Sequence, residues 1–469
     1  MSQTEVTVTR LQQSRKARIA MAKHILSTVE KIRNKKSISI SNIYIPFNPI
    51  SGKEFSGANM IMLMLESIRK GYHDNRWLTR EQIEHVQKSQ PNLEIDTEHL
   101  GPGVKVLRPE EIPYVSLRDG TRKVLSENEY TTLCQRRKAG DAIPQIYYAI
   151  LFTPYTVYNA ANIKGFPDKN EIKPLLLLSD IQKFVSQFVA CSGIRVTYMN
   201  RNDSHYSELD DTIYISASKM IARNEDYSFT TLLLREFYHA SMAGSRECRL
   251  VPEYNMNGSI YSMKDADTDL FTVLASAYIG IPQQFHDVAW HFALFKTEAM
   301  PEDLEFFFQQ ASAAGKMLTV MHQFNMGEQP NVPWFSNKNQ WDIIYKRQEY
   351  AATISIMKDL LKYSYHYFAS KPDTQDKAQH IKRVILDGDF DDMKIELFDI
   401  SHILHNNSTM QWDDGQKRLA QKMLSLWYYL NNNKEIYGEM GIHRQRDTSN
   451  EASETVKNPD NAQQRIRMR

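Results

Sequence analysis

Residues 48–79 read NPISGKEFSGANMIMLMLESIRKGYHDNRWLT, a turn followed by an apolar run and a second turn. A proline, a serine and a glycine between residues 49 and 52 are typical of a tight turn. Residues 60–65 are all apolar and predict a buried helix, which Gly71 is placed to end in a left-handed cap. Thr79 is followed three residues later by Gln82, the pattern of a capping box, so a second helix is expected to begin there.

The first turn carries features that suit an anionic ligand. Lys53 puts a cation on the turn, and residues 56–58 read Ser-Gly-Ala. Such small residues at a helix start let backbone N–H groups approach a phosphate. The stretch therefore indicates a contact with nucleic acid.

This pattern resembles the N-terminal domain of ArdC-type antirestriction proteins, which some plasmid-borne primases share. The resemblance implies a single-stranded DNA-binding domain from a plasmid, phage or conjugative element. A later part of the family pattern, a valine, aromatic and asparagine run that leads to glycine and proline, follows in the same order. The matching positions are Asn48, Pro49, Ser51, Gly52, Gly57, Asn59, Trp77, Leu78, Thr79 and Gln82, followed by Val157, Tyr158, Asn159, Gly165 and Pro167.

On this resemblance we expect the DNA contacts to lie on and near the first turn. Lys53, Arg76 and Trp77 are the leading candidates because turns are exposed and often carry function. Aromatic and basic side chains alternate through this region, as in proteins that stack bases and hold phosphates of single strands, although strand aromatics also pack on sheets. The expected DNA-binding residues are Asn48, Ser51, Gly52, Lys53, Gly57, Asn59, Arg76, Trp77 and Thr79.

The composition is that of an ordinary globular protein with two or three domains. The 469 residues are 42% apolar and 24% charged, and the net charge is +1, so DNA affinity requires a local basic surface. Residues 1–36 contain nine basic and two acidic residues, a net charge of +7. Two interpretations fit this segment, a phosphate-contacting arm and a solvated helix face.

The cysteines and the apolar runs indicate in which cellular compartment the protein is found. Cys134, Cys191 and Cys248 are far apart and indicate neither a disulfide framework nor a cysteine zinc site. No signal-peptide core is evident near residue 1, and the apolar stretch 142–158 is broken by Pro144 and Pro154. We expect a cytoplasmic protein without a membrane partner.

The expected fold class is α+β, with an ArdC-like mixed domain, a zincin-like domain and a helical C-terminal extension. Strands are expected near residues 39–47, 147–158, 194–198 and 211–216, and residues 89–143 are expected to be an irregular charged insert. The expected divisions are a basic N-terminal helix at 1–38, the ArdC-like domain at 39–170, the zincin-like domain at 174–300, the helical extension at 301–441 and a disordered tail at 442–469.

The resemblance also implies a zinc peptidase motif, HExxH, on a helix that follows a strand. In that motif two histidines one turn apart bind zinc and the glutamate acts as general base. Here the five positions hold Arg235, Glu236, Phe237, Tyr238 and His239. Arginine stays protonated and offers no lone pair, so one metal ligand is lost.

The remaining candidates do not complete a metal site. Asp269 stands where relatives supply a third ligand, and with His239 it gives two protein ligands, whereas catalytic zinc normally has three. We therefore expect a catalytically inactive domain without metal or cofactor, in which Arg235 occupies the metal position and pairs with Glu236 or Asp269.

Three functions follow in order of preference. The first is a single-stranded DNA-binding, antirestriction-like protein of a mobile genetic element, with an inactive zincin-like domain. The second is an atypical zinc metallopeptidase that uses Glu236, His239 and Asp269. The third is a scaffold that binds a protein partner through its helical C-terminal region and has lost DNA binding.

Overall fold

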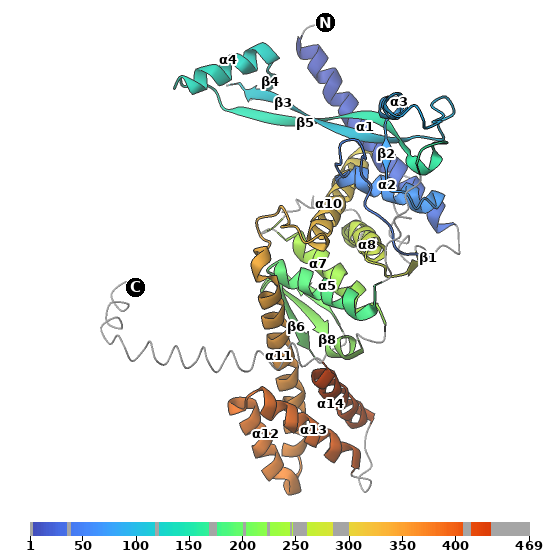
Figure 1. Ribbon diagram of the computed structural model, residues 1–469. Coiled ribbons are helices and arrows are strands. Elements are labelled where there is room, and N and C mark those ends of the chain that lie inside the picture. The colour runs from blue at the N-terminus through green and yellow to red at the C-terminus, as the bar shows by residue number, and fades with distance from the viewer. Residues whose placement is uncertain are drawn as a thin grey trace. The chain divides into compact units, whose positions relative to one another are not determined.

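The computed structural model describes residues 3–34, 39–117, 122–167, 176–199, 203–222, 226–243, 246, 260–284, 300–406 and 414–432. The chain divides into two compact units. The first consists of Met1–Leu176 and Val251–His322, and the second of Leu177–Leu250 and Gln323–Arg469. Both units combine helices with strands, which confirms the expected α+β class (Figure 1).

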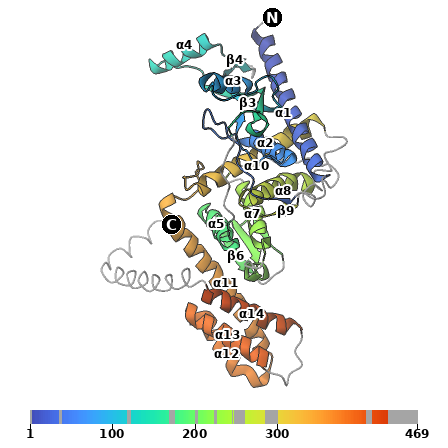
Figure 2. The same ribbon diagram turned by 45° about the vertical axis from the view of Figure 1, so that its right-hand side comes forward.

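A four-stranded antiparallel sheet forms the framework of the first unit, with strand order β2-β5-β3-β4. Its two long strands pair continuously from Val104 opposite Val157 to Val115 opposite Ile146. Figures 1 and 2 show this long ribbon running out to α4 at its end. The bounds are β2 Trp77–Leu78, β3 Val104–Ser116, β4 Arg122–Val124, α4 Glu127–Lys138 and β5 Ile146–Asn159.

Local sequence signals place the helices of this unit. The apolar run lies in α2, Gly57–Lys70, which Gly71 ends with φ 74°, as expected. Thr79 and Gln82 form both bonds of a capping box at the start of α3, Arg80–Ser89. The other elements of the unit are α1 Gln3–Arg33, β1 Ser39–Ile40, η1 Ala160–Asn162, α8 Ile260–Tyr278, β9 Gln283–Gln284 and α10 Pro301–Asn325, which ends in the second unit.

A buried glutamate joins α1 to α2. The side chain of Glu66 is 4% exposed and pairs with Arg69 at 2.6 Å and with His24 at 3.4 Å. Thr28 of α1 donates a hydrogen bond to it at 3.3 Å. Burial opposes ionisation of Glu66, but the hydrogen bonds from His24 and Arg69 outweigh it and lower the pKa to about 2.

Two expectations for this unit are wrong. Residues 89–143 are not an irregular insert, because they contain β3, β4 and α4. The prolines that suggested irregularity, Pro109 and Pro113, lie in a part of β3 that pairs with β5 alone, and an edge strand tolerates proline. The strand expected at 39–47 is only Ser39–Ile40, paired with β9, plus an isolated bridge at Phe47.

The second unit contains a three-stranded sheet of order β6-β8-β7, in which β6 and β8 are parallel. Helices α7 and α11 pack against this sheet, and α5 packs against both of these helices. Three further helices, α12, α13 and α14, gather beside the end of α11 (Figure 2). The bounds are α5 Leu178–Cys191, β6 Arg195–Met199, β7 His205–Ser207, β8 Thr212–Ser216, α6 Ala217–Ile221, α7 Ser228–Ser241, η4 Lys338–Gln340, α11 Trp341–Ala369, η5 Pro372–Thr374, α12 Gln375–Asp387, α13 Phe390–Asn406 and α14 Asp414–Asn432.

The tail expected to be disordered, residues 442–469, lies outside the described residues. Among the helices that the structure describes, none combines the length and the apolarity needed to cross a bilayer.

Candidate nucleic-acid interface

Asn48 ties the first turn to the elements that follow it. Its Oδ1 accepts hydrogen bonds from the backbone N–H groups of Ile50 and Ser51, each at 3.1 Å. Its Nδ2 donates to the carbonyl oxygen of Trp77 at 3.2 Å and to Gln82 at 2.7 Å. Asn48 therefore shapes the turn and fixes it against β2 and α3, which is a positioning role.

Lys53 lies exposed on this turn. Gly52, just before it, has φ 67° and open space where a Cβ would stand, so this turn needs glycine for its backbone conformation. The backbone carbonyl of Lys53 accepts from the N–H of Asn48 at 2.8 Å, and its N–H donates to the Ser51 hydroxyl at 3.3 Å. The ammonium group pairs with no acid in the described part of the chain. The turn thus presents one uncommitted cation on a fixed backbone.

Helix α10 lies against the start of α2, where an anion site was expected. Gly57 has φ 59°, and a Cβ built there would meet Ser312 of α10 at 3.7 Å. A Cβ on Gly315 would lie only 2.1 Å from the carbonyl oxygen of Gly57. The absence of a Cβ on Gly315 therefore lets α10 approach the start of α2 closely.

Asn59 closes an open edge of the large sheet. Its Nδ2 donates to the carbonyl oxygen of Leu107 at 2.7 Å, and its Oδ1 accepts from the N–H of Leu107 at 2.8 Å. The amide thus pairs with β3 as a neighbouring strand would. Asn59 has both functional groups occupied and serves the fold.

Trp77 was expected to be a base-stacking side chain, and its position contradicts that role. It lies on β2 with no exposed surface, edge-on to Tyr72 with ring centroids 6.1 Å apart. An indole in this position cannot stack on a base. The local sequence resembled a turn, but the pairing of β2 with β5 carries Trp77 into the core.

Arg76 is held by groups of its own unit. Its guanidinium forms a fork with Asp74, with closest contact 2.6 Å, and donates to the carbonyl oxygen of Pro167 at 2.5 Å. It also lies over the ring of Phe166, 5.2 Å from the centroid. Its side chain is 15% exposed. Thr79 is likewise occupied as the cap of α3.

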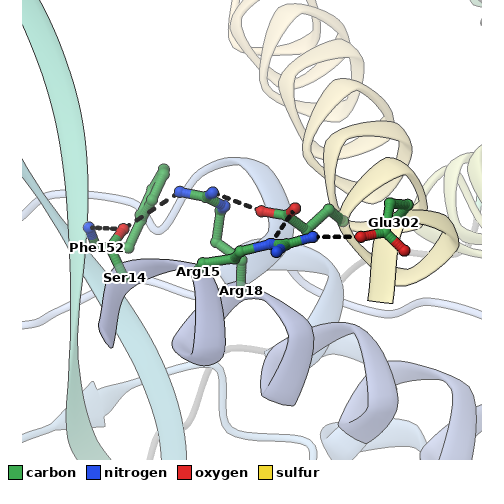
Figure 3. Close-up of polar contacts among 6 residues, drawn as sticks. Ser14, Arg15, Arg18, Phe152 and Glu302 are labelled. Carbon is green, nitrogen blue, oxygen red and sulfur yellow. Dashed lines mark hydrogen bonds and ion pairs between the residues drawn. The ribbon is translucent and has the colours of Figure 1, made fainter. Parts of the chain in front are cut away.

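The basic N-terminal helix is partly committed to packing, an outcome that neither expected interpretation included. Arg15 pairs with Glu302 and Glu305 at 2.7 Å each, and Arg18 pairs with Glu305 at 2.6 Å (Figure 3). Arg18 also lies over the ring of Phe152, 5.8 Å from the centroid. Other cations of the helix remain exposed, namely Lys16, Lys23 and Lys31.

Two exposed arginines lie near the start of α3, and one of them, Arg108, escaped the sequence argument. Arg108 of β3 lies over the ring of Tyr155, 5.1 Å from its centroid. Arg80 donates to the carbonyl oxygen of Thr97 at 3.2 Å. The pKa of Glu81 is lowered by hydrogen bonds from its own backbone N–H and from Thr79, and then by the charges of Arg108 and Arg80. Only the sheet register brings Arg108 to this place.

The five residues that were compared with a zinc-binding motif, Arg235 to His239, lie on α7 in the second unit. Glu236, in the position of the general base, is 7% exposed and accepts a hydrogen bond from the backbone N–H of Tyr206 at 2.8 Å. This bond ties α7 to β7. His239 follows one helical turn after Arg235, and both side chains are partly exposed. Asp269 lies on α8 in the first unit and is 8% exposed.

Beside this motif the structure holds an ion pair that the sequence did not indicate. Arg246 binds Asp211 with both nitrogens of its fork, at 2.7 and 2.6 Å. The Arg246 hydrogen bond lowers the pKa of Asp211. Burial, with help from the hydrogen bond to Asp211, raises the pKa of Tyr206 to about 12. Within the described residues, no three His, Cys, Asp or Glu side chains are grouped so that they could hold a metal ion.

Comparisons with known proteins find similarity to ArdC-type proteins and to primases. Residues 15–89 match the N-terminal domain of anti-restriction factor ArdC. Two proteins named DNA primase TraC from Escherichia coli are similar, at 23% identity over 281 residues and 24% over 257 residues. These alignments cover 58% and 54% of this chain, which spans only 24% and 16% of the primases.

Solved structures of an antirestriction ArdC protein from the R388 plasmid also align with the chain. The metal-free structure is 18% identical with a TM-score of 0.44, covering 66% of this chain and 98% of that one. The Mn(II)-bound structure is 16% identical with a TM-score of 0.43, covering 65% and 97%.

Proposed function

Because residues 15–89 belong to the family of ArdC N-terminal domains, we propose that the first unit binds single-stranded DNA in an antirestriction-like protein of a mobile genetic element. The observation that carries this proposal is the turn at Asn48, which presents the uncommitted Lys53 on a fixed backbone. A phosphate-binding turn needs such a cation, since phosphate contacts supply most of the affinity of single-strand binders.

The nine expected DNA-binding residues then divide into two roles. Lys53 contacts phosphate, with Ser51 and Gly52 beside it on the exposed turn. Asn48, Gly57, Asn59, Trp77 and Thr79 hold the turn, the helix and the sheet in place. Arg76 remains paired with Asp74 and holds the chain in place directly before β2. On this interpretation, most residues of the family pattern maintain the fold, and few of them contact DNA.

Fluorescence anisotropy with a labelled single-stranded oligonucleotide tests the proposal. We expect salt-dependent binding, and Lys53→Ala should reduce the slope of log K against log salt by about 0.7, the value for one lost phosphate contact on a single strand. Lys362→Ala is the matched control because it removes an exposed lysine from α11 in the second unit. If the unaltered chain shows no salt-dependent binding, the proposal is wrong.

We further propose that the region around α7 is a catalytically inactive zincin-like domain. A protonated arginine at position 235 supplies no lone pair, and Glu236 receives the N–H of Tyr206. Both facts favour a structural use of the former motif. Metal analysis of the purified chain decides between this and an atypical peptidase. Stoichiometric zinc that disappears in His239→Ala would establish the peptidase.

A protein partner for the helical region has support from three exposed apolar side chains. Leu386, Ile395 and Tyr428 are 67%, 60% and 54% exposed, on α12, α13 and α14. A triple replacement by serine should abolish binding of a partner recovered with the full chain, and should leave DNA affinity unchanged. Equal loss of DNA affinity would contradict this separation.

A further inference from the structure

The distal ribbon of the first unit forms an arm, defined here as residues 110–117 and 122–151, which include β4 and α4. Figures 1 and 2 place α4 at the far end of the long β3–β5 ribbon. None of the residues of α4 is buried. The arm lies beyond residues 15–89, which match the ArdC N-terminal domain. Packing within the fold therefore leaves much of its surface open.

Two tyrosine pairs stand on this arm. Tyr147 is 39% exposed and stacks on Tyr114, with centroids 5.5 Å apart and planes inclined by 24°. Tyr148 is 51% exposed and lies edge-on to Tyr130, with centroids 6.3 Å apart and hydroxyl oxygens 3.0 Å apart. Each exposed ring is therefore supported by a second ring. Rings that are already held in place lose little entropy when a ligand stacks on them.

Uncommitted cations lie on the same helix as Tyr130. Arg137 follows Tyr130 by seven residues, so it lies on the same helical face, about 10 Å farther along the axis. Arg137 and Lys138 are exposed and form no ion pair with any residue that the structure describes. By contrast, Arg136 pairs with Asp141 at 3.1 Å and Lys123 with Glu129 at 2.7 Å. Arg137 and Lys138 are thus available to an anionic ligand.

We propose that the arm binds single-stranded nucleic acid, with a base stacked on Tyr148 and phosphates held by Arg137 and Lys138. Tyr147, the preceding residue of β5, faces the other side of the ribbon. Stacked rings beside free cations are the combination that single-strand binders use. Protein interfaces are also enriched in tyrosine and arginine, so the salt dependence of binding distinguishes nucleic acid from a protein partner. The inference rests on the proposed DNA binding of the first unit. It assigns the base-stacking surface to the arm, since Trp77 is buried.

Four variants of the full chain test the proposal by anisotropy with a single-stranded oligonucleotide. Tyr148→Leu removes the ring and should weaken binding about fivefold to a hundredfold, the range that one base–ring stack supplies. Tyr148→Phe keeps the ring and should bind within about twofold of the unaltered chain, because base stacking needs the ring itself. Arg137→Ala with Lys138→Ala should lower the salt slope by about 1.4, the sum of two phosphate contacts. Tyr363→Leu, which alters an equally exposed tyrosine of α11, is the control.

The outcomes separate the two proposals. If the unaltered chain binds no oligonucleotide, both proposals fail. If Lys53→Ala weakens binding but Tyr148→Leu does not, the arm proposal fails and the DNA-binding function stands. If Tyr148→Phe is as weak as Tyr148→Leu, stacking is not the cause and the arm proposal is overturned. Far-ultraviolet circular dichroism of each variant verifies that the fold is retained.

Discussion

Gly315 of α10 packs against Gly57 so closely that a Cβ on Gly315 would lie 2.1 Å from the Gly57 carbonyl oxygen. The missing side chain of Gly315 allows α10 to lie against the start of α2, and Gly57 is needed there for its φ of 59°. A contact of 2.7 Å between the Glu54 carboxylate and the His322 imidazole also joins the turn before α2 to α10. The segment from Glu54 to the start of α2 is therefore supported by residues far along the chain.

Gly315→Ala should destabilise the first unit. Adding a methyl group at a contact this close forces the helices apart, which typically costs about 1–3 kcal/mol, more than the roughly 1 kcal/mol that alanine contributes to a helix. Urea unfolding measures the change. Ala313→Gly, at a partly exposed position of the same helix, measures how much the difference in helix propensity between alanine and glycine alone contributes to stability. An unchanged or raised free energy of unfolding in Gly315→Ala would contradict the close packing.

Asn59→Ala should also lower stability, for a different reason. The substitution leaves the N–H and carbonyl groups of Leu107 without their amide partner, and an unpaired buried polar group costs about 1–3 kcal/mol. The exchange rate of the Leu107 amide hydrogen should rise in proportion to the loss of stability. Asn34→Ala, at the exposed end of α1, is the control. Unaltered protection of Leu107 would show that water replaces the side chain without penalty.

Glu66 should make stability depend on pH below about 4.5. Its folded pKa of about 2 lies below the ordinary value, so its contribution is present above the unfolded pKa and is lost as pH falls through the folded pKa. The shift corresponds to roughly 3 kcal/mol. Glu66→Gln should be less stable than the unaltered chain at pH 7, and the difference should shrink between pH 4.5 and 2.

Unfolding free energies at several pH values between 2 and 7 measure this difference. Glu94→Gln is the matched control, because Glu94 is an exposed glutamate of the same unit. If Glu66→Gln and the unaltered chain differ by the same amount at pH 7 and pH 2.5, the ion pairs of Glu66 do not stabilise the fold.

Glu236 should behave as a structural residue. Glu236→Gln retains an oxygen that can accept from the Tyr206 N–H, so its stability should change little. Glu236→Ala leaves that N–H unpaired and should cost about 1–3 kcal/mol. Thermal unfolding of both variants measures the effect. Loss of a peptidase activity in Glu236→Gln at unchanged stability would instead identify a general base.

The sequence predicted those features whose partners lie within a few residues. The capping box of Thr79 and Gln82 and the left-handed cap at Gly71 are both present as expected. Each depends only on local backbone geometry and side-chain chemistry. The long helices and the strands β5, β6 and β8 follow from hydrophobic periodicity for the same reason.

The role of individual site residues could not be predicted in this way. Trp77 and Lys53 both resemble turn residues in the sequence, yet one is fully buried and the other exposed. Pairing with β5, more than 60 residues later, decides the first position. The arm was missed because Pro109 and Pro113 suggested irregular structure, and only the register with β5 shows that an edge strand accommodates them.

By itself the sequence determined the turn at Asn48, the two helix boundaries that follow it, and an arginine at position 235 that offers no lone pair to a metal, because each is fixed by the chemistry of neighbouring residues. The tertiary structure alone decided that α10 lies against the start of α2, that Arg15 and Arg18 pair with α10, and that the exposed tyrosines lie on the arm. These outcomes depend on contacts between segments hundreds of residues apart, or on strand register, and no local pattern encodes either.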